Sequence, residues 1–265
     1  MRHLDQDRLR QAEQSLAALL GPNLKGKSFL DIGCGSGLFS LAARNLGASV
    51  TSLDFDPDSV RCAQGLKETF HPDDASWRIL QGSVLDANLM STLGQFDIVY
   101  SWGVLHHTGQ MWTALAHAVE AVAPGGTLFI SIYNDQGGIS DRWRKVKQAY
   151  VASPKWLRPL LVGTVAVFMQ AKPTLGQILR LKSPFAYWRS LRPATRGMTY
   201  WYDLVDWVGG YPFEVAKPEE IFNFCKDKGL NLEKLKTCGG GAACNEYVLT
   251  KGKQGASLNS VTATQ

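Results

Sequence analysis

The stretch FLDIGCGSGLFSL, residues 29–41, places three glycines between two apolar runs. The run before the glycines is typical of a buried strand, and LFSLAARNLG, residues 38–47, predicts a helix closed by a glycine. Glycines have no Cβ, so the turn between them can adopt positive φ and a ligand can lie against its backbone. A tight turn without any ligand would also use these glycines, so the stretch alone leaves both interpretations open.

The same alternation continues along the chain after an amphipathic helix at residues 4–20. Apolar strands and helices follow one another with short connections: strands 48–56, 76–86, 96–102 and 127–133, with helices 57–70 and 111–123, and later a helix at 218–229 with strands 230–238 and 245–250. This order predicts an α/β fold with a doubly wound, Rossmann-like sheet that is covered on both faces.

The composition fits a soluble, reduced protein of 265 residues, 45% hydrophobic and 19% charged. The polar N-terminus does not resemble a signal peptide, and an odd number of five cysteines indicates the cytoplasm rather than a disulfide framework. The spacing of the cysteines does not match a zinc site, so no metal is expected.

The charges are divided unevenly, because residues 141–200 contain twelve Lys and Arg but one acid, Asp141. We therefore expect residues 141–200 and the rest of the chain to form two regions with different neighbours. The predicted parts are an N-terminal helix at 1–23, a sheet domain at 24–134 and 201–250, a basic, aromatic helical insertion at 135–200, and a disordered tail at 251–265.

Two acids strengthen the interpretation of the glycine turn as a ligand site. Asp54 ends the second strand about twenty residues after the loop, where an acid can accept hydrogen bonds from ribose hydroxyls. Leu38 stands where a dinucleotide fingerprint would require its last glycine. A ligand with a ribose, an ammonium and a carboxylate but no phosphate could instead use Asp31 and the loop amides.

These motifs resemble those of the class I S-adenosylmethionine-dependent methyltransferases. DIGCGSG resembles their first motif, LDFD the second, LQGSVLD the third, FDIVYSWGVLHHT the fourth, and APGGTLFIS the strand that follows. The resemblance covers residues 24–133 and, more weakly, 212–250. It implies a seven-stranded sheet, mostly parallel with an antiparallel last strand, and S-adenosyl-L-methionine as the cofactor. RGM…DWVGGYPFE also loosely resembles the ubiquinone-biosynthesis O-methyltransferases, which weakly implies a hydroxyl acceptor.

The resemblance implies a set of donor-binding residues: Asp31, Gly33, Cys34, Gly35, Gly37, Asp54, Phe55, Ser83, Val84, Ser101 and Trp102. Asp54 would bind the ribose, the backbone around Ser83 and Val84 would line the adenine, and Trp102 would cover the cofactor. Many relatives have an acid where Ser83 stands, so no side-chain contact to the adenine is expected there.

Candidates for the acceptor side follow the fourth and fifth strands. His106 or His107 could act as general base, since imidazole titrates near neutral pH; alternatively, they pack under the cofactor or cap the next helix. Tyr133 and Asn134 end the fifth strand and face the site by position. A later segment, residues 196–221, is rich in aromatic and acidic residues. It could form one wall of the acceptor site, or it could be a surface helix that packs on the domain through its aromatic rings. Its candidate acceptor residues are Arg196, Trp201, Asp203, Asp206 and Glu214.

The basic insertion contains the apolar run WLRPLLVGTVAVFMQA, residues 156–171. It could be a helix capping the domain, lie on an anionic membrane surface, or bind RNA phosphates. The predicted function is methyl transfer to a hydroxyl of a small-molecule or lipid-linked substrate, such as a quinone, polyprenyl or glycan compound. The alternative is a tRNA- or protein-directed methyltransferase, and a cofactor-binding module with a degraded site is a third interpretation. The oligomeric state stays open.

Overall fold

The computed structural model describes residues 6–190, 200–241 and 243–253. The chain divides into two compact units, the first formed by Met1–Asp135 and Val215–Gln265 and the second by Gln136–Glu214. The sequence pattern assigned residues 201–214 to the sheet domain, but they belong to the second unit. The reason is that the helix in this segment buries its apolar residues against other helices of the insertion.

The first unit is built on a seven-stranded sheet with strand order β3-β2-β1-β4-β5-β7-β6. Its strands are β1 (Ser28–Ile32), β2 (Ser49–Asp54), β3 (Trp77–Gln81), β4 (Phe96–Trp102), β5 (Val122–Tyr133), β6 (Leu230–Lys236) and β7 (Cys244–Lys251). The first five strands pair in parallel, whereas β7 runs antiparallel to both β5 and β6. The predicted fold class is therefore confirmed.

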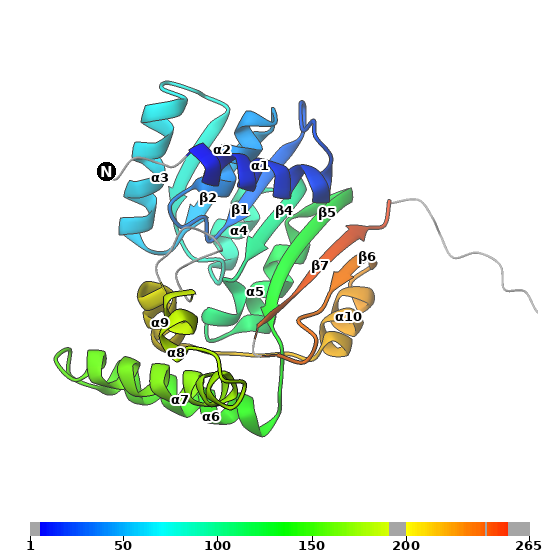
Figure 1. Ribbon diagram of the computed structural model, residues 1–265. Helices are drawn as coiled ribbons and strands as arrows, with labels where there is room; N and C mark the ends of the chain where they lie inside the picture. Colours follow the sequence, from blue (N-terminus) through cyan, green and yellow to red (C-terminus); the bar gives the residue numbers. More distant parts are fainter. Residues whose placement is uncertain (1–5, 191–199, 242, 254–265) are drawn as a thin grey trace, which may run out of the picture. The chain divides into compact units, whose positions relative to one another are not determined.

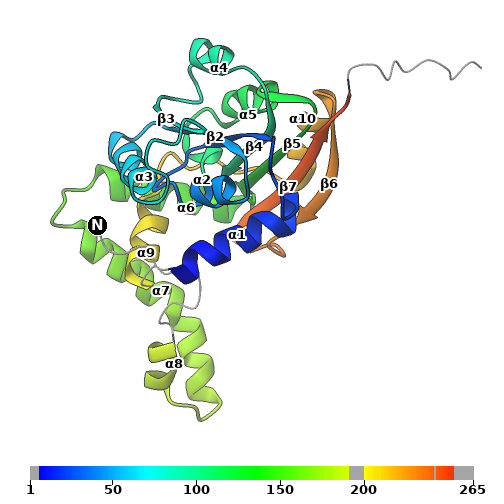
Figure 2. The same ribbon diagram turned by 90° about the horizontal axis from the view of Figure 1, so that it is seen from above.

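Helices cover both faces of this sheet (Figures 1 and 2). One face carries α1 (Gln6–Leu20), α2 (Leu38–Asn45) and α3 (Pro57–Phe70), and the other carries α4 (Ala87–Leu93), α5 (Met111–Glu120) and α10 (Pro218–Asp227). A short 3-10 helix, η1 (Leu105–His107), follows β4. This layering explains why the inner strands are nearly continuous apolar runs, since each must be buried on both sides.

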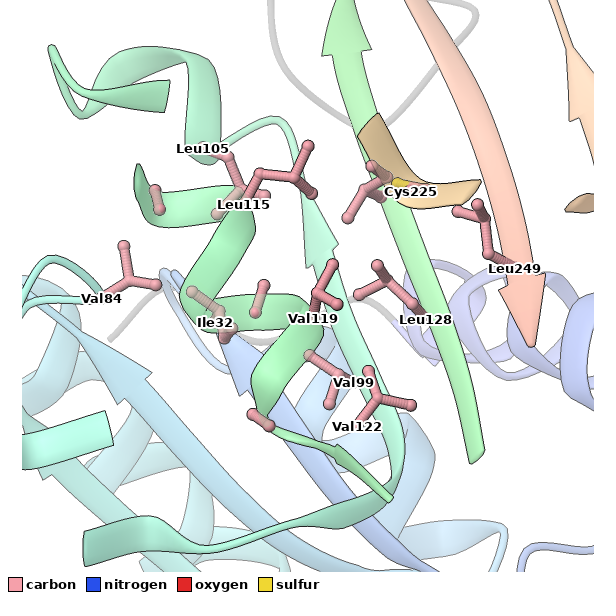
Figure 3. Close-up of a cluster of buried hydrophobic side chains, with 14 of the residues drawn as sticks. Ile32, Val84, Val99, Leu105, Leu115, Val119, Val122, Leu128, Cys225 and Leu249 are labelled. Atoms are coloured by element: carbon pink, nitrogen blue, oxygen red, sulfur yellow. The ribbon is translucent and has the colours of Figure 1, made fainter. Parts of the chain in front are cut away.

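The two faces have separate hydrophobic cores. On the α5 face, Leu115 and Val119 pack with Ile32, Val99 and Leu128 of the sheet (Figure 3). The α1 face has its own cluster, whose members include Leu16, Leu41, Phe29, Tyr100 and Phe129. Each core is built from residues far apart in the sequence. Close packing on both faces of the sheet keeps the central strands in fixed positions.

Two element boundaries differ from the pattern. The strand expected at 76–86 ends at Gln81, and a short helix, α4, begins soon after because the Asp86 carboxylate accepts hydrogen bonds from the first turn, Asn88 N and Leu89 N, both at 3.0 Å. The helix expected to reach residue 123 ends at Glu120, and β5 begins at Val122 with a register shift opposite β4. Neither change moves a strand within the sheet.

The second unit is entirely helical in the residues that the structure describes. It contains α6 (Gly138–Ala152), α7 (Arg158–Leu179), α8 (Pro184–Ser190) and α9 (Tyr200–Gly209). Its buried apolar cluster includes Val162 of α7 with Leu204 and Val208 of α9. The Lys147 side chain of α6 is also fully buried, and its ammonium lies 4.3 Å from the ring centroid of Trp207 and donates to the carbonyl of that residue. The expected helical insertion is thus present as a small bundle.

Candidate active site

The candidate donor site lies at the carboxyl ends of β1, β2 and β3, where the parallel strands of an open sheet end side by side. Asp31 is near the end of β1 and Asp54 is the last residue of β2. The loop after β3 reaches the same place, because Gly82 N donates to the Asp54 carbonyl at 2.9 Å. The predicted donor residues of the first three motifs are therefore brought together.

The glycine loop takes the conformation that the sequence predicted. Gly33, Gly35 and Gly37 have φ of 75°, 54° and 83°, a region that favours glycine over other residues. A Cβ on Gly33 would lie 2.4 Å from Cγ2 of Val104, in the loop after β4. A Cβ on Gly35 would meet nothing within 4 Å. Gly33 thus permits close packing of two loops, while Gly35 borders open space where a ligand can approach.

The amides of this loop mostly hold the protein itself together. Gly33 N and Cys34 N both donate to the Leu53 carbonyl, at 2.7 and 3.1 Å, and Gly37 N donates to the Cys34 carbonyl at 2.9 Å. The sequence predicted that loop amides would bind the ligand. Gly33 and Cys34 instead use their donors to fix the loop against β2, and Gly37 uses its donor to close the turn within the loop.

Two backbone amides hold the Asp54 carboxylate from opposite sides. Gly35 N donates to Oδ2 at 2.8 Å, and Asp56 N donates to Oδ1 at 2.9 Å. Each carboxylate oxygen has further acceptor capacity after these bonds. The loop therefore orients Asp54 as an acceptor, and Phe55, with 76% of its surface exposed, stands next to it as a free ring face.

Asp31 is buried and belongs to a chain of polar side chains. Ser40 Oγ donates to Asp31 Oδ2 at 2.6 Å, Ser52 Oγ donates to Ser40 Oγ at 2.6 Å, and Trp77 Nε1 donates to Ser52 Oγ at 2.9 Å. Burial raises the pKa of Asp31 to about 7, with the Ser40 hydrogen bond opposing this and the Asp54 charge adding to it. We name these four residues the Asp31 relay.

The sequence did not predict the roles of Ser40, Ser52 and Trp77. One signal was available for Ser40, which is a polar residue inside the apolar run of α2. Its pairing with Ser52 depends on how α2 packs on β2, a contact between elements that a one-dimensional pattern does not contain. Burial also raises the pKa of the Cys34 thiol well above its usual value, so this thiol stays protonated.

The third and fourth motifs line the rest of the edge. Ser83 Oγ accepts from Leu85 N at 3.1 Å, and the Val84 carbonyl lies 2.7 Å from Nδ1 of His117 on α5. Ser101 is fully buried, and its hydroxyl donates to the Ile32 carbonyl at 3.1 Å. These bonds fix the backbone of both motifs beside the glycine loop.

Trp102 packs against the core of the α1 face, and its Nε1 donates to Glu246 Oε1 of β7 at 3.3 Å. The expectation that Trp102 covers the cofactor stays a prediction.

Three rings form a cluster after β4 and β5. The centroid of His106 lies 4.6 Å from that of His107 and 4.0 Å from that of Tyr133, and His107 and Tyr133 are 5.4 Å apart. His106 is fully buried, whereas His107 is half-buried. The predicted catalytic candidates and one predicted acceptor residue are thus adjacent, and of the histidines His107 is the more accessible.

Asn134 is held at the end of β5. Asn245 Nδ2 donates to Asn134 Oδ1 at 3.0 Å, and Asn134 N donates to the Ala243 carbonyl at 3.0 Å. Its side chain therefore joins the end of β5 to β7, and its backbone amide joins it to the turn before β7. Asn134 stays a predicted acceptor contact beside Tyr133.

The remaining acceptor candidates belong to the second unit. Trp201 lies on α9 and is 44% exposed, and Glu214 is the last residue of that unit. Asp203 and Asp206 also lie on α9, as expected for a helix, but their side chains are outside the described part of the structure. Arg196 lies outside the described residues altogether. Their contact with an acceptor stays a prediction.

A groove of about 450 Å³ lies at the opposite end of the sheet, between the end of α1 and the strands. Its lining includes Lys27, Ile98, Thr127 and Thr250, which are near the amino ends of the parallel strands or the far end of β7. Ligands of open α/β sheets bind at the carboxyl ends, so we do not assign the donor to this groove.

Comparison with known proteins shows which family the chain belongs to. Residues 1–215 match a family model described as a methyltransferase domain. The chain is 33% identical over 116 residues to the ubiquinone biosynthesis O-methyltransferase of Methylobacterium sp. (strain 4-46), covering 43% of this chain and 45% of that protein. It is 36% identical over 106 residues to the mitochondrial enzyme of the same name from Schizosaccharomyces pombe, covering 40% of this chain and 38% of that protein. The matches span less than half the length of these relatives.

Among solved structures, the chain is similar to magnesium protoporphyrin IX methyltransferase from Synechocystis PCC 6803 with bound SAH. The TM-score is 0.53 at 16% identity, with 93% of this chain and 83% of that chain covered. At this identity the likeness supports the fold alone. Because the family model spans most of the chain, the protein belongs to the methyltransferase-domain family, as its resemblance to the class I S-adenosylmethionine-dependent methyltransferases predicted.

Proposed function

We propose that this chain transfers the methyl group of S-adenosylmethionine to a hydroxyl group of a small-molecule or lipid-linked acceptor. The observation that carries the proposal is the Asp54 carboxylate, held by the amides of Gly35 and Asp56 beside the open side of the glycine loop. A ribose presents two hydroxyl donors to such a carboxylate. Family membership supports methyl transfer as the reaction class.

The residues present fit the donor in three respects. The space next to Gly35 admits a ligand to the backbone, the Asp54 carboxylate offers acceptors for the ribose, and the exposed ring of Phe55 offers a face for stacking. In its ionised form the Asp31 carboxylate would also be able to pair with an ammonium group. When bound, S-adenosylmethionine supplies a methyl group that is activated by its sulfonium charge.

The chain's own residues must then orient the acceptor and accept its proton. His107 is the proposed general base, because it is half-buried beside Tyr133 and a neutral imidazole can take a proton near neutral pH. Tyr133 has a phenolic hydroxyl that can hold the acceptor oxygen. His106, which is fully buried, packs against the ring of His107.

The acceptor class rests on the relatives. The two curated relatives named above are ubiquinone biosynthesis O-methyltransferases, so a hydroxyl of a quinone-like compound with an apolar tail is the first candidate. We place the reaction in the cytoplasm, where the chain's five cysteines, all free thiols, would stay reduced.

The test is methyl transfer from labelled S-adenosylmethionine into a fractionated cell extract. Label in the organic-solvent phase supports a lipid or quinone acceptor, and label in water-soluble small molecules supports the hydroxyl acceptor without a tail. Label in tRNA or protein would overturn the proposed acceptor and favour the macromolecule-directed alternative.

A variant with His107→Ala should bind the donor normally and lose most of its turnover, about 100-fold or more, since general bases contribute typically this much. His71→Ala, a half-buried histidine at the end of α3, is the control for the loss of an imidazole. Turnover of the His107 variant that equals the unaltered chain at every pH would mean that the base is another group.

A further inference from the structure

The outer face of α7 is apolar and exposed, which is unusual for a helix of a compact unit. Leu160, Val167, Phe168, Leu175 and Ile178 recur at the spacing of one helical face, and Leu179 borders it. All six are exposed, with Phe168 at 78% and Leu179 at 76%. We name these six residues the α7 stripe.

The helix does not need this stripe for its own packing. Val162 and Gln170 lie on the other side of α7 and are buried, Val162 with Leu204 and Val208 of α9, and Gln170 beside Tyr187 of α8. The Tyr187 hydroxyl donates to Gln170 Oε1 at 2.7 Å. An exposed apolar face of this length, with the buried face already satisfied, indicates a binding surface.

Cations and tryptophans flank the stripe. The exposed Lys155 lies before its start and Arg180 and Lys182 just beyond its end, and the sequence contains no Asp or Glu between residues 142 and 202. Trp156 is 79% exposed before the stripe, and Trp188 is exposed after it. Basic side chains around an apolar face, with tryptophans at the edges, complement the anionic headgroups and acyl chains of a lipid surface.

We propose that the α7 stripe lies in the surface of an anionic lipid bilayer, parallel to its plane. From Leu160 to Leu179 the stripe is about 30 Å long at ~1.5 Å per residue. A second copy of the chain would bring the same cations together, so charge opposes a symmetric contact. The six apolar side chains of the stripe themselves offer nucleic acid no hydrogen-bond donor. In the part of the chain that the structure describes, no helix has the length and apolar character needed to cross a membrane.

The experiment is co-sedimentation of the full chain with vesicles of phosphatidylcholine, with and without phosphatidylglycerol. Binding should be strong only with the anionic lipid and should weaken with salt. The double variant F168E/L175E should bind at least about tenfold more weakly, since each exposed side chain would no longer insert. The control is F70E, which places one glutamate at an exposed phenylalanine of α3 in the other unit.

A second pair of variants tests the charges. R180E/K182E should lower binding to anionic vesicles by about tenfold or more, because each surface cation contributes about fivefold. K226E/K228E makes the same change in charge on exposed lysines at the end of α10 and should have a smaller effect.

Vesicle binding is measured without donor or acceptor, so it does not depend on the proposed reaction. The proposal is wrong if the unaltered chain binds neither vesicle, or if F168E/L175E binds like the unaltered chain. A dimer in solution that F168E/L175E dissociates, or RNA binding that R180E/K182E abolishes without any vesicle binding, would also overturn it.

Discussion

At the scale of single residues, Asp54 depends on its neighbours for its orientation. Both of its oxygens accept from backbone amides, at 2.8 and 2.9 Å, so the carboxylate is positioned before any ligand binds. A group held in this way does not lose side-chain freedom on binding. Its effect on the donor should therefore be measurable as affinity.

Replacing Asp54 by alanine should weaken S-adenosylmethionine binding by about 1–3 kcal/mol, since a charged hydrogen-bond acceptor is lost. Isothermal calorimetry measures the change directly. Asp58→Ala removes an exposed carboxylate of α3 that pairs with Arg61, and it is the charge-matched control. Equal affinities for the Asp54 variant and the unaltered chain would show that the donor binds elsewhere.

Asp31 should make the stability of the first unit depend on pH. Its pKa is about 7 in the folded chain against an ordinary value of 3.8. Between these values the unfolded chain releases a proton that the folded chain keeps, so the free energy of unfolding should fall as pH rises toward and through about 7. Asp31→Asn should remove this dependence, and chemical denaturation at several pH values measures it.

Ser40→Ala tests how much the hydrogen bond from Ser40, as distinct from burial, sets the pKa of Asp31. Because the Ser40 hydrogen bond lowers the pKa of Asp31, its loss should move the pH dependence to higher pH and make the decline in stability larger. Ser91→Ala, on exposed α4, is the control. A pH profile of the Ser40 variant that coincides with the unaltered profile would mean that the relay does not set the proton affinity of Asp31.

At the scale of elements, the glycine loop is held by the loop after β4 as well as by its own turn. A Cβ on Gly33 would overlap both methyl groups of Val104, at 2.4 and 2.5 Å, and the φ of 75° disfavours any other residue. The glycine at position 33 therefore allows the first and fourth motifs to pack closely together.

Gly33→Ala should destabilise the first unit by several kcal/mol, from the overlap and the backbone strain together. Gly33→Ala with Val104→Ala removes the overlap with the two methyl groups but leaves Cβ of residue 104 at 2.9 Å and the backbone strain, so it should recover part of the loss. Thermal unfolding of the two variants measures the difference. Equal stability of the two would mean that the contact with Val104 contributes nothing.

At the scale of the whole molecule, the two units have separate cores. The predicted donor residues belong to Met1–Asp135, whereas the core of the second unit includes Leu204 and Val208. Lys147 adds to that core by lying 4.3 Å from the Trp207 ring and 4.8 Å from the Phe213 ring. Changes in one core should therefore be measurable without changes in the other.

Leu204→Ala should destabilise the second unit by about 2–5 kcal/mol, the usual loss for a buried leucine, and leave S-adenosylmethionine affinity unchanged. Hydrogen exchange resolved by segment follows the stability of residues 136–214, and calorimetry follows the donor. Leu160→Ala, on the exposed face of α7, is the control. Weaker donor binding in the Leu204 variant would show that the donor site depends on the second unit.

The sequence predicted more of the donor side than of the acceptor side for a physical reason. Gly33, Asp31 and Asp54 are local signals, because a turn with positive φ and an acid at a strand end are specified within a few residues. The boundary at Glu214 was not predicted, because α9 is as apolar as a helix of the sheet domain and only its packing shows which unit it joins. The sequence did not indicate which face of α7 is exposed, for the same reason.

The sequence by itself determined the α/β alternation, the glycine loop and the residues at the strand ends, because these follow from periodicity and from the conformations that glycine allows. Only the tertiary structure decided the Asp31 relay, the contact between Gly33 and Val104 and the side of α7 that stays exposed. Each of these depends on side chains from distant segments meeting in space. Which of these contacts form depends on how well the side chains fit and how deeply they are buried, and a linear pattern does not contain this information.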